Sequence, residues 1–389
     1  MGFRGVDYYD VASLLTEEER LIQKTVRTFV DDRVMPVIVR HYEAGTFPAD
    51  LVPAMGELGL LGANLEGYGC AGLGAVAYGL ILQELERGDS GIRSFCSVQG
   101  SLVMYPIHAF GSDAQKERWL PRLAKGEAIG CFGLTEPDFG SNPAGMLTRA
   151  EPQGKGDGFV LNGTKRWITN AGVADVALVW AKLDGEVRGF LVEKDAPGLV
   201  QRKITDKFSL RASVTGELLM EDCRVPGSAL LPGAKGMKGP LMCLNQARYG
   251  IAWGAIGAAM ACYETALDYA KDRVQFSRPI AGYQLVQHKL VEMLSEITKA
   301  QLLCHRLGRL KEEGKLVHTQ VSLAKRNNVR QALEIARVAR DVLGANGIMY
   351  EYPVARHMLN LESVYTYEGT HDIHTLILGQ DITGLSAFE

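Results

Sequence analysis

The sequence predicts a mainly α-helical protein with a β insert in its middle third. Apolar residues recur at helical spacing in the first and last thirds, whereas the middle contains short apolar runs separated by turn-forming pairs. The 389 residues also exceed what one ordinary hydrophobic core holds. We therefore expect an N-terminal α-helical domain over residues 1–130, a middle β domain over 131–235 and a C-terminal α-helical domain over 236–389.

The first third contains several helix signals. Thr16 and Glu19 form a capping-box pattern ahead of apolar residues at helical spacing. A second helix is expected to open at Pro48, and a glycine-rich loop follows at 67–74. Further helices are expected over residues 76–87, 91–105 and 115–123, and Pro106 is expected to end the second of these.

The middle third changes to a strand pattern. Asn162-Gly163 lies between strand-like runs and predicts one β-hairpin, and Asp184-Gly185 predicts a second. Residues 216–220 and 223–225 are expected to form two further short strands. The last third returns to helix, with expected helices over residues 240–272, 283–314, 317–343 and 371–382.

The composition excludes several classes of function. The formal net charge is −3, which offers no concentrated positive patch for a nucleic-acid backbone. Seven cysteines without C-x-x-C spacing argue against a disulfide framework or a structural zinc site. The longest apolar stretch, 250–262, is shorter than the roughly 20 residues of a membrane span. Without a targeting signal, we expect a cytoplasmic protein, or a mitochondrial matrix protein if this is a processed eukaryotic form.

Two local motifs receive ordinary structural interpretations. Gly67, Gly69 and Gly72 match the dinucleotide pattern G-x-G-x-x-G, but helices rather than a strand precede and follow them, which favours a plain loop. His371 and His374 lack the further ligands of a zinc site, so we expect no metal.

Four segments together resemble the acyl-CoA dehydrogenase family across nearly the whole chain: GLTEPDFGS at 133–141, WIT at 167–169, DRVQF at 272–276 and YEGT at 367–370. LNQARYGIAW at 244–253 and YEGTHDIH at 367–374 are most similar to the glutaryl-CoA dehydrogenase branch. The resemblance implies a middle β-barrel domain, a C-terminal four-helix bundle, a homotetramer and FAD as cofactor.

The resemblance also implies a reaction. Glu368 would take the α proton of an acyl thioester while the β hydrogen leaves as hydride to flavin N5. A carboxylate with a pKa of about 4 is a weak base for this proton, and burial would raise that pKa. The backbone N–H of Glu368 would hold the thioester carbonyl. The alternative is that Glu368 merely caps the last helix.

Further site residues follow from the same resemblance. The implied flavin contacts are Phe132, Leu134, Thr135, Trp167, Ile168 and Thr169. A neighbouring subunit would add Arg273, Phe276 and Gln284, and the cofactor site would continue through Asp341, Gly344, Ala345 and Thr370. The implied substrate contacts are Ser94, Ser141, Leu241, Asn245, Arg248, Gly369 and Phe388.

Arg93 directs the prediction towards glutaryl-CoA. The glutaryl branch places an arginine here against the distal carboxylate of the substrate, and a buried arginine needs such a partner. Glu86 could hold Arg93 when substrate is absent. Decarboxylating members share a polar network whose counterparts here are Glu86, Arg93, Ser94, Thr169 and Tyr367.

The resemblance therefore implies oxidative decarboxylation of glutaryl-CoA to crotonyl-CoA and CO2, as in lysine and tryptophan degradation, with electron-transferring flavoprotein as acceptor. Four alternatives remain open. They are a surface arginine with an unbranched short-chain acyl-CoA as substrate, a glutaryl-CoA dehydrogenase that does not decarboxylate, an oxidase that passes electrons to oxygen, and a non-catalytic scaffold of the same fold.

Overall fold

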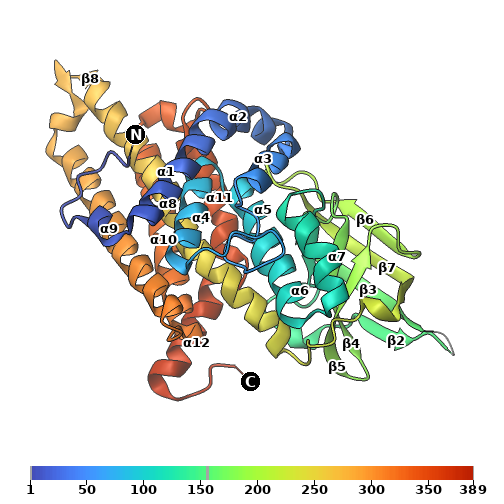
Figure 1. Ribbon diagram of the computed structural model, residues 1–389. Coiled ribbons are helices and arrows are strands. Elements are labelled where there is room, and N and C mark those ends of the chain that lie inside the picture. The colour runs from blue at the N-terminus through green and yellow to red at the C-terminus, as the bar shows by residue number, and fades with distance from the viewer. Residues whose placement is uncertain (1, 155–156, 389) are drawn as a thin grey trace.

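The computed structural model describes residues 2–154 and 157–388, and it confirms the predicted order of helical, β and helical parts. Figure 1 shows the first and last parts packed together as one helical body, with the sheet at one end of that body. The N-terminal helices are α1 Glu17–Phe29, α2 Met35–Ala44, α3 Val52–Glu57, α4 Ala75–Gly88, α5 Ser90–Ser97, α6 Tyr105–Phe110 and α7 Asp113–Ala124.

The capping box of α1 forms as predicted. Thr16 Oγ1 accepts from the backbone N–H of Glu19 at 3.2 Å, and Glu19 Oε2 accepts from the backbone N–H of Thr16 at 2.8 Å. Farther along, every residue of α4 is buried, because this helix packs between α1 and the long helix α8 Lys238–Asp272. Any polar side chain on α4 must therefore find its partner inside the protein.

A π-helical segment, Val98–Met104, joins α5 to α6 without a break. The expectation that Pro106 ends a helix is wrong, because Pro106 lies in the first turn of α6, which continues directly from the π-helical segment. Gln99 of the π-helical segment accepts from the backbone N–H of Gly130 at 2.9 Å and donates to the carbonyls of Leu123 and Ala128. This segment therefore ties the helices to the first strand.

The middle part is a single curled seven-stranded sheet. The strands are β1 Gly130–Gly133, β2 Arg149–Pro152, β3 Gly158–Thr169, β4 Val176–Leu183, β5 Glu186–Glu193, β6 Leu199–Lys203 and β7 Thr215–Pro226. Strands β1 and β2 both run parallel to β4, β2 also pairs with β3, and β3, β7 and β6 continue the sheet. The predicted Asp184-Gly185 hairpin is confirmed between β4 and β5.

The predicted hairpin at Asn162-Gly163 is wrong. Both residues lie inside the continuous strand β3, which pairs with β7 along its length, and β7 itself joins the two short strands expected at 216–225. The register shifts between Leu161 and Gly163, and a Cβ on Gly163 would lie 2.4 Å from Thr148 Oγ1. Gly163 therefore serves a bulge and a close approach rather than a turn.

The last part contains the long helices that the sequence predicts. They are α8, α9 Gln284–Glu312 and α10 His318–Val342, followed by α11 Pro353–Thr366 and α12 His371–Thr383. The sequence did not predict α11. A small hairpin of β8 Val274–Gln275 and β9 Arg278–Pro279 projects between α8 and α9 (Figure 1). Within the described ranges, no helix is long and apolar enough to cross a membrane.

The loop between β6 and β7 fastens the sheet to the helices. Leu210 donates its backbone N–H to Asn360 Oδ1 at 2.8 Å, and Asn360 donates in turn to Asp89 Oδ2 at 3.0 Å. The same loop continues to Val214, whose carbonyl accepts from the backbone N–H of Asn170 at 2.9 Å, directly after the end of β3. The end of β3 is therefore held towards α5 and α11.

Candidate active site

The link between α11 and α12 carries the central residue of the site. Glu368 has φ +52° and Gly369 has φ +87°, so two consecutive residues adopt the left-handed conformation. This conformation costs a non-glycine residue about 1–2 kcal/mol. Thr370 provides the N-cap of α12, since its Oγ1 accepts from the backbone N–H of Ile373 at 3.1 Å. The alternative that Glu368 caps this helix is therefore wrong.

Two buried cations hold the backbone of this link. Arg248 of α8 donates through Nε to the carbonyl of Glu368 at 2.8 Å. Lys325 of α10 donates through Nζ to the carbonyl of Tyr367 at 2.7 Å and to that of Gly369 at 2.6 Å. Three consecutive carbonyls thus accept from cations, whereas the backbone N–H of Glu368 has no acceptor within the described protein.

The carboxyl group of Glu368 lies in a buried, positively charged setting. Its Oε2 atom is buried and has no hydrogen-bond partner among the described residues. Burial raises the pKa of Glu368 above its usual value, although three nearby cations oppose this effect. Those cations are Arg93, Lys325 and Arg248. Burial also lowers the pKa of Lys325 to about 7.

Arg93 of α5 lies in the same buried cluster. Its Nε donates to Glu86 Oε2 of α4 at 2.6 Å, its Nη2 donates to the phenol oxygen of Tyr367, and its guanidinium lies 5.7 Å from the centre of the Tyr367 ring. Both Arg93 and Glu86 are fully buried. The third guanidinium nitrogen, Nη1, is buried without a partner in the described structure.

The surroundings of the Arg93–Glu86 pair leave little free space. Ser90 donates its hydroxyl to the other carboxylate oxygen of Glu86 at 2.8 Å. On α8, a Cβ added to Gly254 would lie 2.0 Å from Glu86 Oε2 and 3.1 Å from Arg93 Nε. A glycine is therefore needed at position 254, where the Arg93–Glu86 pair packs against α8.

The matches to known families place these residues in context. The chain matches the acyl-CoA dehydrogenase N-terminal domain over residues 16–127, the middle domain over 131–223 and the C-terminal domain over 234–383. These three matches span well over half of the chain. The chain belongs to the acyl-CoA dehydrogenase family. It is an oxidoreductase acting on a CH–CH bond, and because the family binds FAD, the predictions of enzyme class and cofactor are confirmed at this level.

Solved structures of related dehydrogenases resemble this acyl-CoA dehydrogenase closely. A glutaryl-CoA dehydrogenase from Mycobacterium smegmatis is 60% identical, with a TM-score of 0.96 and 97% of each chain covered. Another from the same organism, in complex with FADH2, is 54% identical, with a TM-score of 0.96 and 98% of each chain covered. The human mitochondrial short-chain specific acyl-CoA dehydrogenase is 36% identical over 372 residues, covering 94% of this chain and 90% of its own.

The residues predicted for flavin binding on the sheet lie at one end of β1 and β3. Phe132 and Leu134 are buried, and Thr169 pairs with Thr215 of β7. Trp167 lies at the second register shift of β3, has φ +64° and exposes 55% of its surface. No hydrogen bond in the described part of the chain joins Thr169 to Arg93, Glu86 or Tyr367. Two further residues belong to this group. Thr135 directly follows Leu134, and Ile168 is buried in β3.

A second group of predicted cofactor residues lies far from Glu368. Arg273 follows the end of α8, 25 residues after Arg248 (273 − 248), which corresponds to about 37 Å along an α-helix. Phe276 exposes 90% of its surface on the β8–β9 hairpin. Gln284, Gly344 and Ala345 are exposed, and Asp341 forms an ion pair with Lys289. One chain alone therefore does not bring these residues to Glu368.

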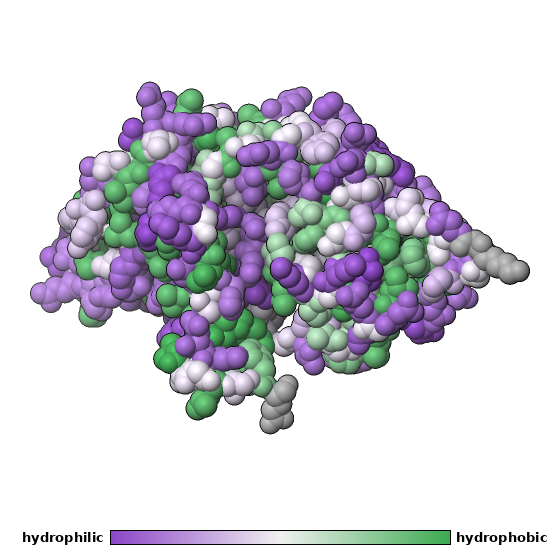
Figure 2. Space-filling model, turned by 60° about the horizontal axis from the view of Figure 1, so that its bottom comes forward, coloured by the Kyte–Doolittle hydropathy of each residue, from purple (hydrophilic) through white to green (hydrophobic). Residues whose placement is uncertain are grey.

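The predicted substrate residues are distributed along α8 and the chain ends. Asn245 is half-buried one turn before the buried Arg248, and Leu241 is exposed in the first turn of α8. Ser94 is buried next to Arg93, and Gly369 adjoins Glu368. Ser141 and Phe388 are exposed, the former in the loop after β1 and the latter near the C-terminus. Figure 2 shows the C-terminal segment projecting beside a notch that separates it from the sheet.

Sequence reasoning missed Lys325 and His374. Lys325 lies on the apolar stripe of α10, with Val321 four residues before it and Val329 four residues after it, and a cation on such a stripe was the available signal. His374 is fully buried beneath Gly369, and burial lowers its pKa to about 3. No cluster of histidine, cysteine and acidic residues in the described chain could hold a metal ion.

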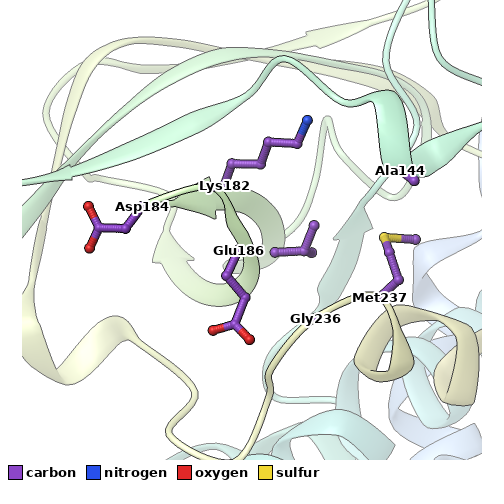
Figure 3. Close-up of a pocket in the computed structure, with 8 residues that line it drawn as sticks. Ala144, Lys182, Asp184, Glu186, Gly236 and Met237 are labelled. Atoms are coloured by element: carbon purple, nitrogen blue, oxygen red, sulfur yellow. The ribbon is translucent and has the colours of Figure 1, made fainter.

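A separate hollow opens on the sheet side of the molecule. Its volume is about 600 Å³, and Lys182, Asp184 and Glu186 of the β4–β5 hairpin line it together with Ala144 and Met237. Figure 3 shows the two acidic side chains pointing apart, with Met237 opposite them. It contains none of the residues of the Arg93 cluster, so it belongs to a different part of the acyl-CoA dehydrogenase surface.

Proposed function

We propose that this acyl-CoA dehydrogenase carries out the FAD-dependent oxidative decarboxylation of glutaryl-CoA to crotonyl-CoA and CO2. One observation carries the choice of substrate. Arg93 is fully buried beside Glu368, and one of its guanidinium nitrogens has no partner in the part of the chain that the structure describes. A buried donor of this kind is costly to leave unpaired, and a carboxylate on the far end of the acyl chain would satisfy it.

The residues present fit a flavin. The exposed indole of Trp167 offers an aromatic face, Phe132 and Leu134 offer apolar contact, and the exposed guanidinium of Arg273 suits a pyrophosphate. We propose that Ile168, Thr169, Thr135 and Thr370 complete this site, with Arg273, Phe276, Gln284, Asp341, Gly344 and Ala345 acting from a neighbouring subunit of a homotetramer. When bound, FAD supplies the acceptor for the hydride that leaves the β carbon.

Glu368 is the proposed base. Its unpartnered Oε2 is free to take the α proton, and its raised pKa brings its basicity closer to that task. The uncommitted backbone N–H of Glu368 can donate to the thioester carbonyl, which gains negative charge as the proton leaves. The base and the donor of the carbonyl hydrogen bond thus belong to one residue.

Arg93 and Tyr367 are proposed to hold the distal carboxylate. After dehydrogenation, the bond from the γ carbon to this carboxylate breaks, CO2 leaves, and the electron pair passes to the thioester; protonation then gives crotonyl-CoA. Glu86 keeps the charge of Arg93 balanced before substrate arrives. Asn245, Arg248, Ser141, Leu241, Gly369, Ser94 and Phe388 remain proposed contacts of the acyl-CoA, and electron-transferring flavoprotein is the proposed electron acceptor.

An unbranched short-chain acyl-CoA is the second candidate substrate. The similarity to the human short-chain enzyme over 372 residues favours it. It does not account for Arg93, because an alkyl chain would leave the buried Nη1 unsatisfied.

Anaerobic mixing of the FAD-loaded enzyme with glutaryl-CoA tests the proposal, with flavin absorbance and CO2 release followed together. We expect the flavin band to bleach and CO2 to be released in equal amount. Bleaching without CO2 would identify a non-decarboxylating dehydrogenase, and bleaching by butyryl-CoA but not by glutaryl-CoA would identify the short-chain enzyme. Peroxide formed in air would indicate an oxidase, and no bleaching by any thioester would indicate a scaffold.

A further inference from the structure

We propose that Lys325 is a positioning residue for the catalytic base, a role that rests on the proposed function of Glu368. Its Nζ donates to the carbonyls of Tyr367 and Gly369, the residues on either side of Glu368. Lys325 acts on the backbone that carries the base.

The conformation of the link explains why such support is needed. Glu368 and Gly369 both have positive φ, and no helix or strand includes them. Lys325 supplies the hydrogen bonds to the carbonyls of Tyr367 and Gly369, and Arg248 donates to the carbonyl of Glu368. Without Lys325, the carbonyls of Tyr367 and Gly369 would lose these donors, and the link would be free to relax towards ordinary backbone conformations.

Lys325 also brings a charge to the site. The ionisable groups that face it are Glu368 and Tyr367 from the link, Arg248 from α8, Arg93 from α5, and His371 and His374 from α12. Among these, Glu368 is the only acid with an ordinarily negative charge. A charged Lys325 therefore favours the ionised form of Glu368, while Arg248 and Arg93 act in the same direction.

A half-buried lysine of the same helical bundle offers a control. Lys311 of α9 donates to Gln246 Oε1 at 2.6 Å and lies 4.3 Å from the centre of the Tyr249 ring. Like Lys325, it is a cation inside the helical bundle, and burial lowers its pKa to about 8. It makes no hydrogen bond to residues 367–369 in the described structure. Loss of a desolvated cation from the helical bundle would be common to Lys311→Met and Lys325→Met.

The test compares Lys325→Met, Lys325→Gln and Lys311→Met as FAD-loaded proteins with glutaryl-CoA. We expect Lys325→Met to lower kcat at least tenfold with KM changed less than threefold. In its pH profile of kcat/KM, the fall on the acid side should move to higher pH by about one unit. Lys325→Gln keeps an amide donor without the charge, so it should show the same shift in pH with a smaller loss of kcat. Lys311→Met should stay within threefold of the wild type.

A second readout does not depend on turnover. Exchange of the α proton of a thioester with deuterated water, followed by NMR without an electron acceptor, reports the base alone, and Glu368→Gln should abolish it. Slower exchange in Lys325→Met supports the proposal. Unchanged exchange with an unmoved pH profile in a folded Lys325→Met protein overturns it. A wild-type enzyme that exchanges no thioester proton would instead overturn the function proposed for Glu368.

Discussion

Arg93 and Glu86 form a fully buried ion pair through Nε and Oε2 at 2.6 Å, and this pair leaves Arg93 Nη1 without a partner among the described residues. Arg93 is therefore neutralised by the protein but not saturated with hydrogen bonds. The arrangement suits a residue that must accept a second carboxylate without paying the full cost of an unpaired buried charge beforehand.

The first prediction concerns substrate choice. A double variant, Glu86→Gln with Arg93→Met, removes both charges and so leaves neither one buried alone. We expect it to lower kcat/KM for glutaryl-CoA about 100-fold, equivalent to about 3 kcal/mol, because the distal carboxylate loses its cation. Activity with butyryl-CoA should be kept or improved. Equal losses with both substrates, measured by steady-state kinetics, would contradict the role of Arg93.

The second prediction uses Gly254, where two effects oppose each other. Alanine is favoured over glycine inside a helix by about 1 kcal/mol. At Gly254, however, the added Cβ would lie 2.0 Å from Glu86 Oε2, so the ion pair must move. We expect Gly254→Ala to reduce kcat/KM for glutaryl-CoA at least tenfold.

Gly379 provides the matched control for this change. It lies in α12, and no described residue lies within 4 Å of the position that an added Cβ would take. Gly379→Ala should therefore raise the melting temperature slightly and leave kinetics unchanged. If Gly254→Ala behaved in the same way, the contact between α8 and the pair would not limit specificity.

The third prediction concerns pH. The base acts in its ionised form, and burial raises the pKa of Glu368 above its usual value, so activity should fall as the pH drops through that raised value. We expect the acid limb of kcat/KM to lie above pH 4.5, the ordinary carboxyl value. Glu368→Gln should lower kcat by about 1,000-fold and remove the limb. A limb at or below the ordinary value would contradict burial of the base.

The fourth prediction concerns stability. Burial lowers the pKa of His374 from 6.5 to about 3, so protons bind more tightly to this side chain in the unfolded state. Its contribution to stability is present above pH 6.5 and is lost as the pH falls towards 3, by about 2 kcal/mol at pH 5. Urea unfolding at pH 8 and pH 5 should therefore show less acid sensitivity in His374→Leu than in wild type. His288→Leu, at an exposed position on α9, should retain the wild-type sensitivity.

The sequence predicted the long helices because their apolar spacing is regular over several turns. It failed where one residue type can have two structural roles. Asn162-Gly163 is a strong turn signal, but here the glycine is required by the approach of Thr148, which lies in another part of the chain. A proline usually ends a helix, but at Pro106 the helical run continues from the π-helical segment into α6.

The site was predictable to the extent that its residues lie in short recognisable segments. Glu368, Tyr367 and Arg93 were found in this way, and the structure brings them together. Lys325 and His374 were not found. The place of Lys325 on the apolar stripe of α10 indicated burial but not the carbonyls that it binds, and a histidine shortly after a helix cap is an ordinary residue until its burial is known. Their partners lie on distant elements, which no local pattern contains.

The π-helical segment Val98–Met104 has a consequence for the geometry of the whole helical body. A wider turn adds one residue relative to an α-helix, and one residue corresponds to about 100° of rotation. The side chains of α6 are therefore rotated about the helix axis by about that angle, relative to where an uninterrupted α-helix from α5 would place them. Arg93 lies on α5, and Gln99 of the π-helical segment binds β1. Deleting a single residue from Val98–Met104 would turn either Arg93 away from Glu86 or the following helix away from β1. The length of this segment is therefore constrained.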